Sequence, residues 1–182
     1  MMSVYTEEDF ALLQQAARFE ESALSVIYDR YQGALYRYAY RLLGDEQLAE
    51  DCISETFCRF LKNLLSCSPP YENLRAYLYR IAHNWITDYY RRGQRERLVE
   101  LKDEFPGHQD FVEEINDGLQ IDQVRAAILS LTPDQQQVIL LKYFEGWQNE
   151  EIAHFMGKRV GAVKALLHRS IATLKKKCPN QE

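Results

Sequence analysis

The sequence predicts an all-α protein of two small helical domains joined by an acidic linker. Apolar residues recur at helical spacing along most of the chain, and no segment alternates long enough to predict a strand. A polar, strongly acidic stretch interrupts this pattern, and 182 residues suffice for two small cores. The predicted boundaries are 1–97 for the first domain, 98–120 for the linker and 121–182 for the second domain.

Start and stop signals place the helices of the first domain. A helix predicted over about 21–43 ends at Gly44, which can adopt the left-handed conformation of a C-terminal cap. Asp45 can then cap a helix over about 46–65, because its carboxylate can accept a hydrogen bond from a free backbone N–H. A shorter helix near the N-terminus is predicted to begin at Thr6 and to bury Phe10, Leu13 and Ala17.

The last helix of the first domain, predicted over about 74–92, mixes arginines with aromatic residues. It follows a loop marked by Pro69 and Pro70, because consecutive prolines cannot continue a helix. Cations hold phosphates and aromatic faces hold unstacked bases, so this mixture suits single-stranded nucleic acid better than a duplex. The alternative that Tyr77 and Trp85 are core residues stays open at this stage.

The second domain ends in the pattern of a helix-turn-helix. A short helix is predicted over 150–156, and Gly157 ends it. A second helix is predicted from about Val160 to Leu174. Such a pair presents its second helix to the major groove of DNA, and the alternative is a plain helical hairpin with a solvated basic face. Before it, Thr132 begins a helix with a capping box. The positions predicted to face inward are Ile152, Ala153, Met156, Val163, Leu166 and Leu167.

The charge distribution also favours a nucleic-acid partner, although the whole chain carries a net charge of −5. Residues 75–97 carry +4 and residues 150–182 carry +4, whereas residues 98–122 between them carry −7. Two basic segments thus flank an acidic connector that would avoid duplex DNA.

Other functional classes lack support in the sequence. No nucleophile with a neighbouring base, phosphate-binding glycine loop or metal-ligand spacing is present, so we expect no enzyme activity, no cofactor and no metal. No basic-then-apolar leader and no long apolar run is present, which predicts a cytoplasmic protein without membrane insertion. The cysteines, interpreted as reduced thiols, are Cys52, Cys58, Cys67 and Cys178.

Three segments together resemble a known family. LYRYAYRLLGDEQLAEDCISETFCRFL (35–61), NLRAYLYRIAHNWITDYYRR (73–92) and the stretch 131–176 occur in the order and spacing of extracytoplasmic-function sigma factors of bacterial RNA polymerase. The resemblance implies a sigma region 2 domain at 1–97 and a sigma region 4 domain at 121–182. It further implies a sigma factor that binds core polymerase, recognises the −35 and −10 promoter elements and assists promoter melting.

The implied partners are promoter DNA and core RNA polymerase, contacted at the clamp helices of its largest subunit and at its flap. An anti-sigma factor is a further candidate partner. Two alternatives remain: a stand-alone helix-turn-helix regulator whose N-terminal half senses a ligand or dimerises, and, with weaker support, a helical adaptor.

The resemblance also assigns residues to these roles. The polymerase-binding candidates are Glu50, Asp51, Ser54, Glu55 and Phe57. The −10 candidates are Tyr77, Arg80, Asn84, Asp88, Arg91 and Arg92, and the loop 66–72 corresponds to a pocket for a flipped base. The −35 candidates are Arg159, Val160, Gly161, Lys164, Ala165, His168 and Arg169.

Three positions depart from the family pattern. Relatives usually have an apolar residue and then a capping serine or threonine where this chain has Lys158 and Arg159, and an arginine is frequent at the position of Leu166. The preferred promoter sequence therefore cannot be transferred from relatives.

Overall fold

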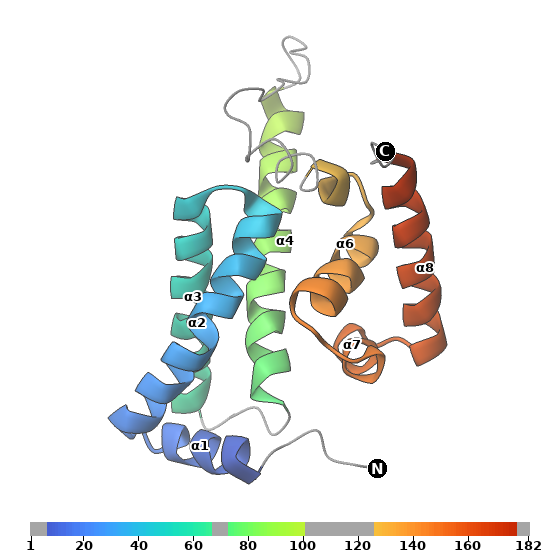
Figure 1. Cartoon of the computed structure of the whole chain (residues 1–182). Coiled ribbons are helices and arrows are strands. Elements are labelled where there is room, and N and C mark those ends of the chain that lie inside the picture. Colours follow the sequence, from blue (N-terminus) through green and yellow to red (C-terminus); the bar gives the residue numbers. More distant parts are fainter. Residues whose placement is uncertain (1–6, 67–72, 101–125, 178–182) are drawn as a thin grey trace, which may run out of the picture. The chain divides into compact units, whose positions relative to one another are not determined.

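The computed structural model describes residues 7–66, 73–100 and 126–177, and of residues 7–9 and 93–100 it describes the backbone alone. The chain divides into two compact units, Met1–Glu104 and Phe105–Glu182. Helices make up both units, and the described residues contain no strand (Figure 1). The predicted all-α fold is confirmed.

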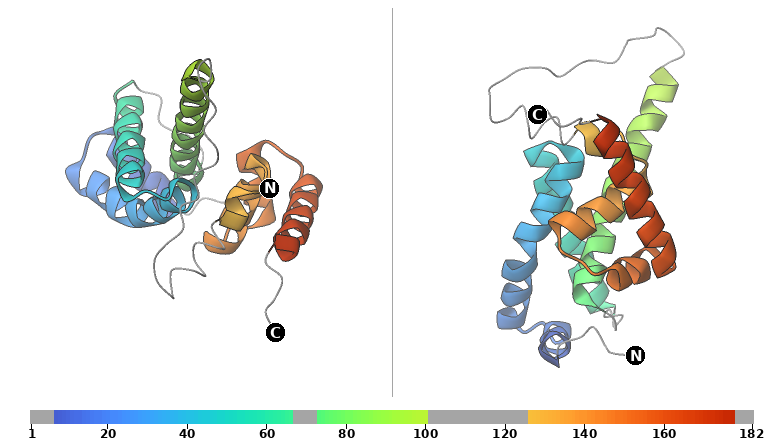
Figure 2. Two further views of the ribbon diagram at one scale, coloured as in Figure 1. Left: turned by 90° about the horizontal axis from the view of Figure 1, so that it is seen from above. Right: turned by 45° about the vertical axis from the view of Figure 1, so that its right-hand side comes forward.

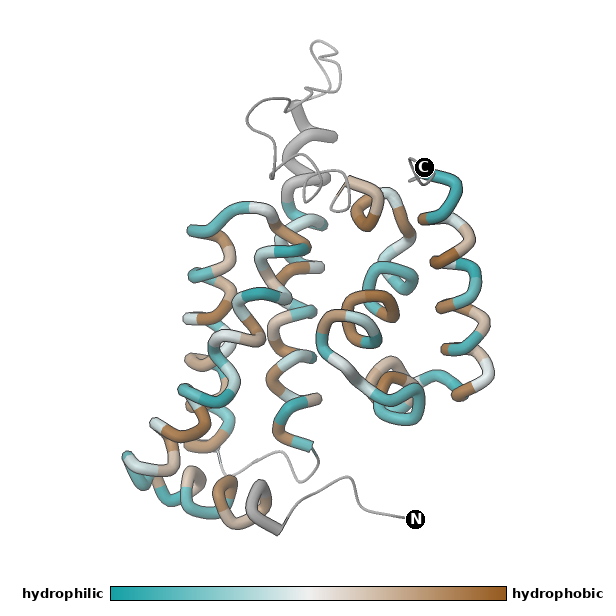
Figure 3. Tube along the Cα trace, in the orientation of Figure 1, coloured by the Kyte–Doolittle hydropathy of each residue, from teal (hydrophilic) through white to brown (hydrophobic). Residues whose placement is uncertain are grey.

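The first unit is a helical bundle of α1 (Glu7–Ala17), α2 (Glu21–Leu43), α3 (Glu46–Leu65) and α4 (Leu74–Glu100). Helices α2, α3 and α4 pack against one another in pairs, and α1 lies across the end at which α2 begins and α3 ends (Figures 1 and 2). Hydrophobic positions recur at turn spacing along these helices (Figure 3). The largest fully buried side chains of this core are Ile27, Leu35, Tyr38, Phe60, Leu78 and Tyr79.

The hairpin between α2 and α3 forms where its capping residues predict it. Gly44 has a φ of 70°, and its N–H donates to the carbonyl of Tyr40 at 2.8 Å. The carboxylate of Asp45 accepts from the backbone N–H of Leu48 at 2.8 Å. Two adjacent residues thus cap the end of α2 and the start of α3, which allows α3 to return directly along α2.

Two sequence predictions for this unit were wrong in detail. In α1, Leu13 is buried as predicted, but Phe10 is 51% exposed and the second buried residue is Ala16 rather than Ala17. Helix α4 continues past residue 92 to residue 100, because Gly93 is followed by strong helix formers and does not end the helix by itself.

The second unit begins, within the described residues, with a helical turn at 126–129. It continues through α6 (Pro133–Ile139), a single π-helical turn η1 (Leu140–Phe144), α7 (Asn149–Met156) and α8 (Val160–Lys177). Helices α6 and α7 both pack against α8. The predicted capping box is present, since the N–H of Thr132 donates to Oε1 of Gln135 at 3.1 Å.

Candidate nucleic-acid and protein interfaces

The turn between α7 and α8 has the geometry that the sequence predicts. Gly157 has a φ of 62°, a conformation that a side chain would disfavour. Its N–H donates to the carbonyl of His154 at 3.2 Å, and the N–H of Lys158 donates to that of Ala153 at 2.9 Å. These bonds satisfy the last carbonyls of α7 and direct the chain into α8.

The inner faces of α7 and α8 are almost those predicted. Ile152, Ala153, Val163 and Leu167 are buried, whereas Met156 and Leu166 are only half-buried. The buried side chains that the sequence analysis missed are Phe155, three residues after Ile152, and Ser170, three residues after Leu167. Helical spacing could have found both of them. Phe155 packs edge-on against the buried Trp147, with 5.3 Å between ring centroids.

The outer face of α8 carries nearly all of the −35 candidates. The backbone carbonyl of Arg159 accepts from the N–H groups of Ala162 and Val163, so Arg159 stands immediately before the helix. Arginine has no side-chain acceptor, and its guanidinium therefore cannot cap α8 as serine or threonine would. Val160 is half-buried at the helix start. The exposed members are Arg159, Gly161, Lys164, Ala165, His168 and Arg169.

The −10 candidates on α4 do not all share one environment. Arg80, Asn84, Arg91 and Arg92 are exposed, while Asp88 is half-buried and pairs with Arg91 at 2.8 Å. This exposed basic and polar surface extends over the helix from Arg80 to Arg92.

Tyr77, in contrast, packs against α3 within the helical bundle of the first unit. It is half-buried, its hydroxyl accepts a hydrogen bond from the side chain of Asn63, and its ring meets that of Phe60 at a centroid distance of 6.4 Å. The structure therefore separates Tyr77 from the exposed candidates and gives its hydroxyl a partner within the fold.

Aromatic rings extend the exposed surface of α4. Trp85 is half-buried and stacks on Tyr89, with centroids 5.8 Å apart and ring planes 7° apart. Tyr89 is 41% exposed and also meets Tyr90, whose hydroxyl donates to the carbonyl of Leu42 at 2.5 Å. The stack is thus anchored to the end of α2 while one side of Tyr89 remains accessible.

The polymerase-binding candidates on α3 occupy several sides of that helix. Glu50, Asp51 and Ser54 are exposed. Glu55 accepts a hydrogen bond from Arg59 at 2.6 Å, and this bond holds the pKa of the Glu55 carboxyl below its ordinary value.

Phe57 does not share this exposure. It is 9% exposed, and the ring of Tyr28 from α2 covers it at a centroid distance of 4.8 Å. Consecutive residues of a helix point in directions 100° apart, so the segment 49–57 cannot present every member to one partner. The accessible aromatic residue at this place is Tyr28, which the sequence analysis did not select.

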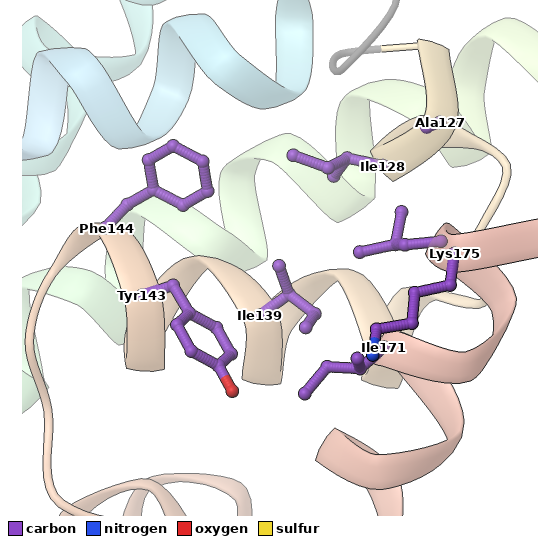
Figure 4. A pocket seen from close by; sticks show the side chains of 8 residues that line it. Ala127, Ile128, Ile139, Tyr143, Phe144, Ile171 and Lys175 are labelled. Carbon is purple, nitrogen blue, oxygen red and sulfur yellow. The ribbon is translucent and has the colours of Figure 1, made fainter. Parts of the chain in front are cut away.

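An apolar pocket of about 340 Å³ opens in the second unit (Figure 4). Its wall includes residues of η1, where Tyr143 is 59% and Phe144 is 42% exposed. In this turn the N–H of Glu145 donates to the carbonyl of Leu140, five residues earlier, at 3.1 Å. π-Helical turns of this kind often occur at functional sites. The lining residues are Ala127, Ile128, Ile139, Tyr143, Phe144, Ile171, Leu174 and Lys175.

The two described cysteines differ in environment. Burial raises the pKa of the Cys52 thiol to about 12, and Cys58 is exposed. Cys67 and Cys178 lie outside the described residues. Histidine, cysteine and acidic side chains of the described segments form no group that could hold a metal ion, and none of the described helices could cross a membrane.

Comparison with known proteins identifies two conserved regions. The family profile of Sigma-70 region 2 matches residues 27–96, and that of Sigma-70, region 4 matches residues 121–174. The chain is 31% identical over 173 residues to the ECF RNA polymerase sigma factor BldN of Streptomyces coelicolor, covering 93% of this chain and 65% of BldN. It is 30% identical over 166 residues to the ECF RNA polymerase sigma factor SigL of Mycobacterium tuberculosis, covering 91% of this chain and 94% of SigL.

Solved structures share the fold. CnrH, in complex with the cytosolic domain of CnrY, is 24% identical with a TM-score of 0.73, over 94% of this chain and 97% of CnrH. The sigma factor RpoE of Bartonella quintana, in complex with the anti-sigma factor NepR, is 20% identical with a TM-score of 0.66, over 89% of this chain and 98% of RpoE. Neither the stand-alone regulator nor the helical adaptor is favoured by these comparisons. This chain belongs to the extracytoplasmic-function sigma factors of the sigma-70 family.

Proposed function

We propose that this protein is a promoter-specificity subunit of RNA polymerase that recognises the −35 element as a duplex and captures the −10 element as a single strand. The observation that carries the proposal is the coexistence, in one chain, of an exposed basic helix-turn-helix and an exposed aromatic and basic face on α4. The first suits the major groove, and the second suits unstacked bases.

Recognition of −35 is assigned to the start of α8. Residues near the N-terminus of a recognition helix enter the groove most deeply, so Arg159, Lys164, Ala165 and His168 are placed at base edges. Val160 and Gly161 bring the backbone close to the DNA, and Arg169 is placed on a phosphate. All of these residues except the half-buried Val160 are exposed, which supports this assignment.

Recognition of −10 is assigned to α4. Asn84 offers both a donor and an acceptor to a base edge, and Arg80, Arg91 and Arg92 would neutralise phosphates. Asp88 acts through Arg91, which it holds at 2.8 Å. Tyr77 supports the position of α4 through its contacts within the bundle rather than by touching DNA.

Polymerase binding is assigned to two surfaces, one in each unit. The exposed acids Glu50 and Asp51, with Ser54 and Glu55, suit the basic surface expected of the clamp helices of the largest subunit. Phe57 contributes by packing under Tyr28. The apolar pocket of the second unit, with Tyr143 on its wall, suits an apolar helix of the polymerase flap.

The remaining assignments concern the linker and regulation. The acidic segment 98–120 and the loop 66–72 both lie largely outside the described residues, and the resemblance to the family alone supports their roles in the cleft and in base capture. An anti-sigma factor is proposed as a regulator, because the related RpoE was solved with one. Catalysis of RNA synthesis would belong to the polymerase and not to this chain, which would act in the bacterial cytoplasm where the polymerase works.

Reconstitution tests the proposed function. Core polymerase mixed with the full chain should form a stable complex and produce run-off transcripts from a library of randomised promoters, and the enriched promoters should share −35 and −10 motifs. Core polymerase alone is the control. Failure of the chain to bind core polymerase, or DNA binding of equal specificity without polymerase, would overturn the proposal in favour of a stand-alone regulator.

A further inference from the structure

The apolar pocket of the second unit opens beside the point where the described part of that unit begins. Ile128 lines it from the turn 126–129, and Ile139 of α6 and Ile171 of α8 face the same space (Figure 4). Its volume of about 340 Å³ is within the range of pockets that bury most of a bound group. Lys175 is exposed and is the charged member of the wall. The pocket therefore suits an apolar group that has an acidic neighbour.

The segment 110–119, DFVEEINDGL, has both properties in its sequence. It belongs to the same unit as the pocket, lies outside the described residues and falls in neither matched family region. In a helix that Asp110 could cap and Gly118 could end, Phe111 and Ile115 would share one face. Two helical turns are too short to be stable alone in water, so this apolar face needs a surface to pack on. The acids, which fall on the opposite face, are Asp110, Glu113, Glu114 and Asp117.

The connection between this segment and the pocket is short. Residues 120–125 separate Leu119 from Ala126, where the described residues resume. Such a connection spans at most about 25 Å. Ala127 already lines the pocket, so the segment can reach it. A short tether raises the effective concentration of the segment to the millimolar range, and even a weak contact is then populated.

We propose that the segment 110–119 docks in the apolar pocket of its own unit in the free chain, with Phe111 and Ile115 in the pocket and an acid of the segment beside Lys175. The docked segment covers the surface assigned above to the polymerase flap, so the flap must displace it. Displacement also frees the acidic linker for its proposed role in the cleft. The docking does not depend on the proposed function, whereas the displacement rests on it.

Two other occupants fit the pocket less well. The same segment of a second copy lacks the tether, so it competes only at the concentration of the protein in solution. Nucleic acid gains little from a wall whose charged member is Lys175 alone, because its affinity comes mainly from the neutralisation of several phosphates.

Hydrogen–deuterium exchange of the free full chain, followed by mass spectrometry, tests the docking. Amides of residues 111–117 should exchange on the order of tenfold more slowly than in an unstructured peptide of the same sequence. Ile115→Ser should remove this protection, because it withdraws an apolar side chain from the pocket. Asn116→Ser changes the next residue without removing an apolar group, so this matched control should keep the protection.

Lys175→Glu tests the docking from the side of the pocket. A negative charge there should repel the acids of the segment and reduce its protection, most strongly at low salt. Lys177→Glu is the matched control, because Lys177 is exposed at the end of α8 and does not line the pocket. Absence of protection in the wild type, or protection that persists in both Ile115→Ser and Lys175→Glu, would overturn the docking. Protection that rises with protein concentration would also overturn it and assign the pocket to a second copy.

Association with core polymerase tests the displacement. In stopped-flow mixing of the labelled full chain with core polymerase, Ile115→Ser should associate about 3- to 10-fold faster than the wild type, because its pocket is open beforehand. Asn116→Ser should associate at the wild-type rate. Equal rates for all three chains would overturn the displacement, while the exchange results alone decide the docking. A wild-type chain that does not bind core polymerase would overturn the proposed function and the displacement together.

Discussion

Lys158 and Asp134 form an ion pair, with 2.9 Å between the ammonium nitrogen and Oδ2 of the carboxylate. Lys158 lies in the turn of the helix-turn-helix, and Asp134 lies in the first turn of α6. The pair therefore connects the turn to the helix that precedes the motif. This contact gives a structural reason for a lysine at a position where relatives usually have an apolar residue.

The Lys158–Asp134 pair should affect DNA binding more than stability. Its side chains are 33% and 53% exposed, and such pairs contribute roughly 0.2–1 kcal/mol to the free energy of unfolding. Asp134→Asn frees an ammonium group beside Arg159 and should tighten holoenzyme binding to a −35 duplex at low salt. Glu150→Gln, which removes an exposed acid from α7, is the matched charge control. Equal effects of the two substitutions would mean that Lys158 does not reach a phosphate.

The acids of α3 should contribute unequally to polymerase binding. Asp51 is exposed, whereas Glu55 is already hydrogen-bonded to Arg59. We expect Asp51→Lys to weaken binding on the order of tenfold and Glu55→Gln to weaken it much less, because Asp51 is free to meet a cation. Competition of each variant against labelled wild-type chain for core polymerase measures both. A larger loss for Glu55→Gln would contradict the proposed face.

Asn84 should act during promoter melting. Asn84→Ala is expected to impair open-complex formation on a duplex promoter more than on a promoter with a pre-melted −10 region, because the bubble removes the cost of unpairing. Permanganate footprinting on the two templates gives the comparison. Equal defects would indicate that Asn84 supports only the fold, which its exposure does not favour.

The substitution Arg159→Ser tests whether Arg159, which cannot cap α8, contacts the −35 DNA instead. Replacing it with serine restores a side-chain cap worth about 1 kcal/mol to helix stability. If Arg159 contacts a base, Arg159→Ser should also relax preference at one −35 position by roughly 1–3 kcal/mol. Selection from randomised −35 elements with each holoenzyme measures this. An even loss across all sequences would place Arg159 on a phosphate, and an unchanged motif and affinity would place it away from DNA.

Cys52 should resist alkylation while the protein is folded. Its pKa of about 12 leaves roughly one thiol in ten thousand ionised at pH 8, and only the thiolate reacts. Cys58 is exposed and should react before Cys52. Mass spectrometry of peptides after iodoacetamide treatment distinguishes the two sites, and denaturation should abolish the difference. Rapid labelling of Cys52 in the native protein would indicate that α3 and α4 open locally.

The helical segments, and those of their ends that depend on local signals, could be predicted from the amino-acid sequence. Gly44 and Asp45 define the hairpin between α2 and α3, and Gly157 defines the turn before α8, because capping hydrogen bonds and a positive φ involve neighbouring residues only. The basic outer face of α8 also followed from helical spacing.

Which side chains remain accessible depends instead on how the helices pack against one another. Phe57 and Tyr77 belong to motifs associated with binding, yet the first packs under Tyr28 and the second contacts Asn63 and Phe60. On α2, Tyr28 and Tyr40 remain exposed although α3 and α4 both pack against this helix. Local sequence fixes the direction of each side chain around its own helix, but burial depends on which neighbouring helix covers that direction.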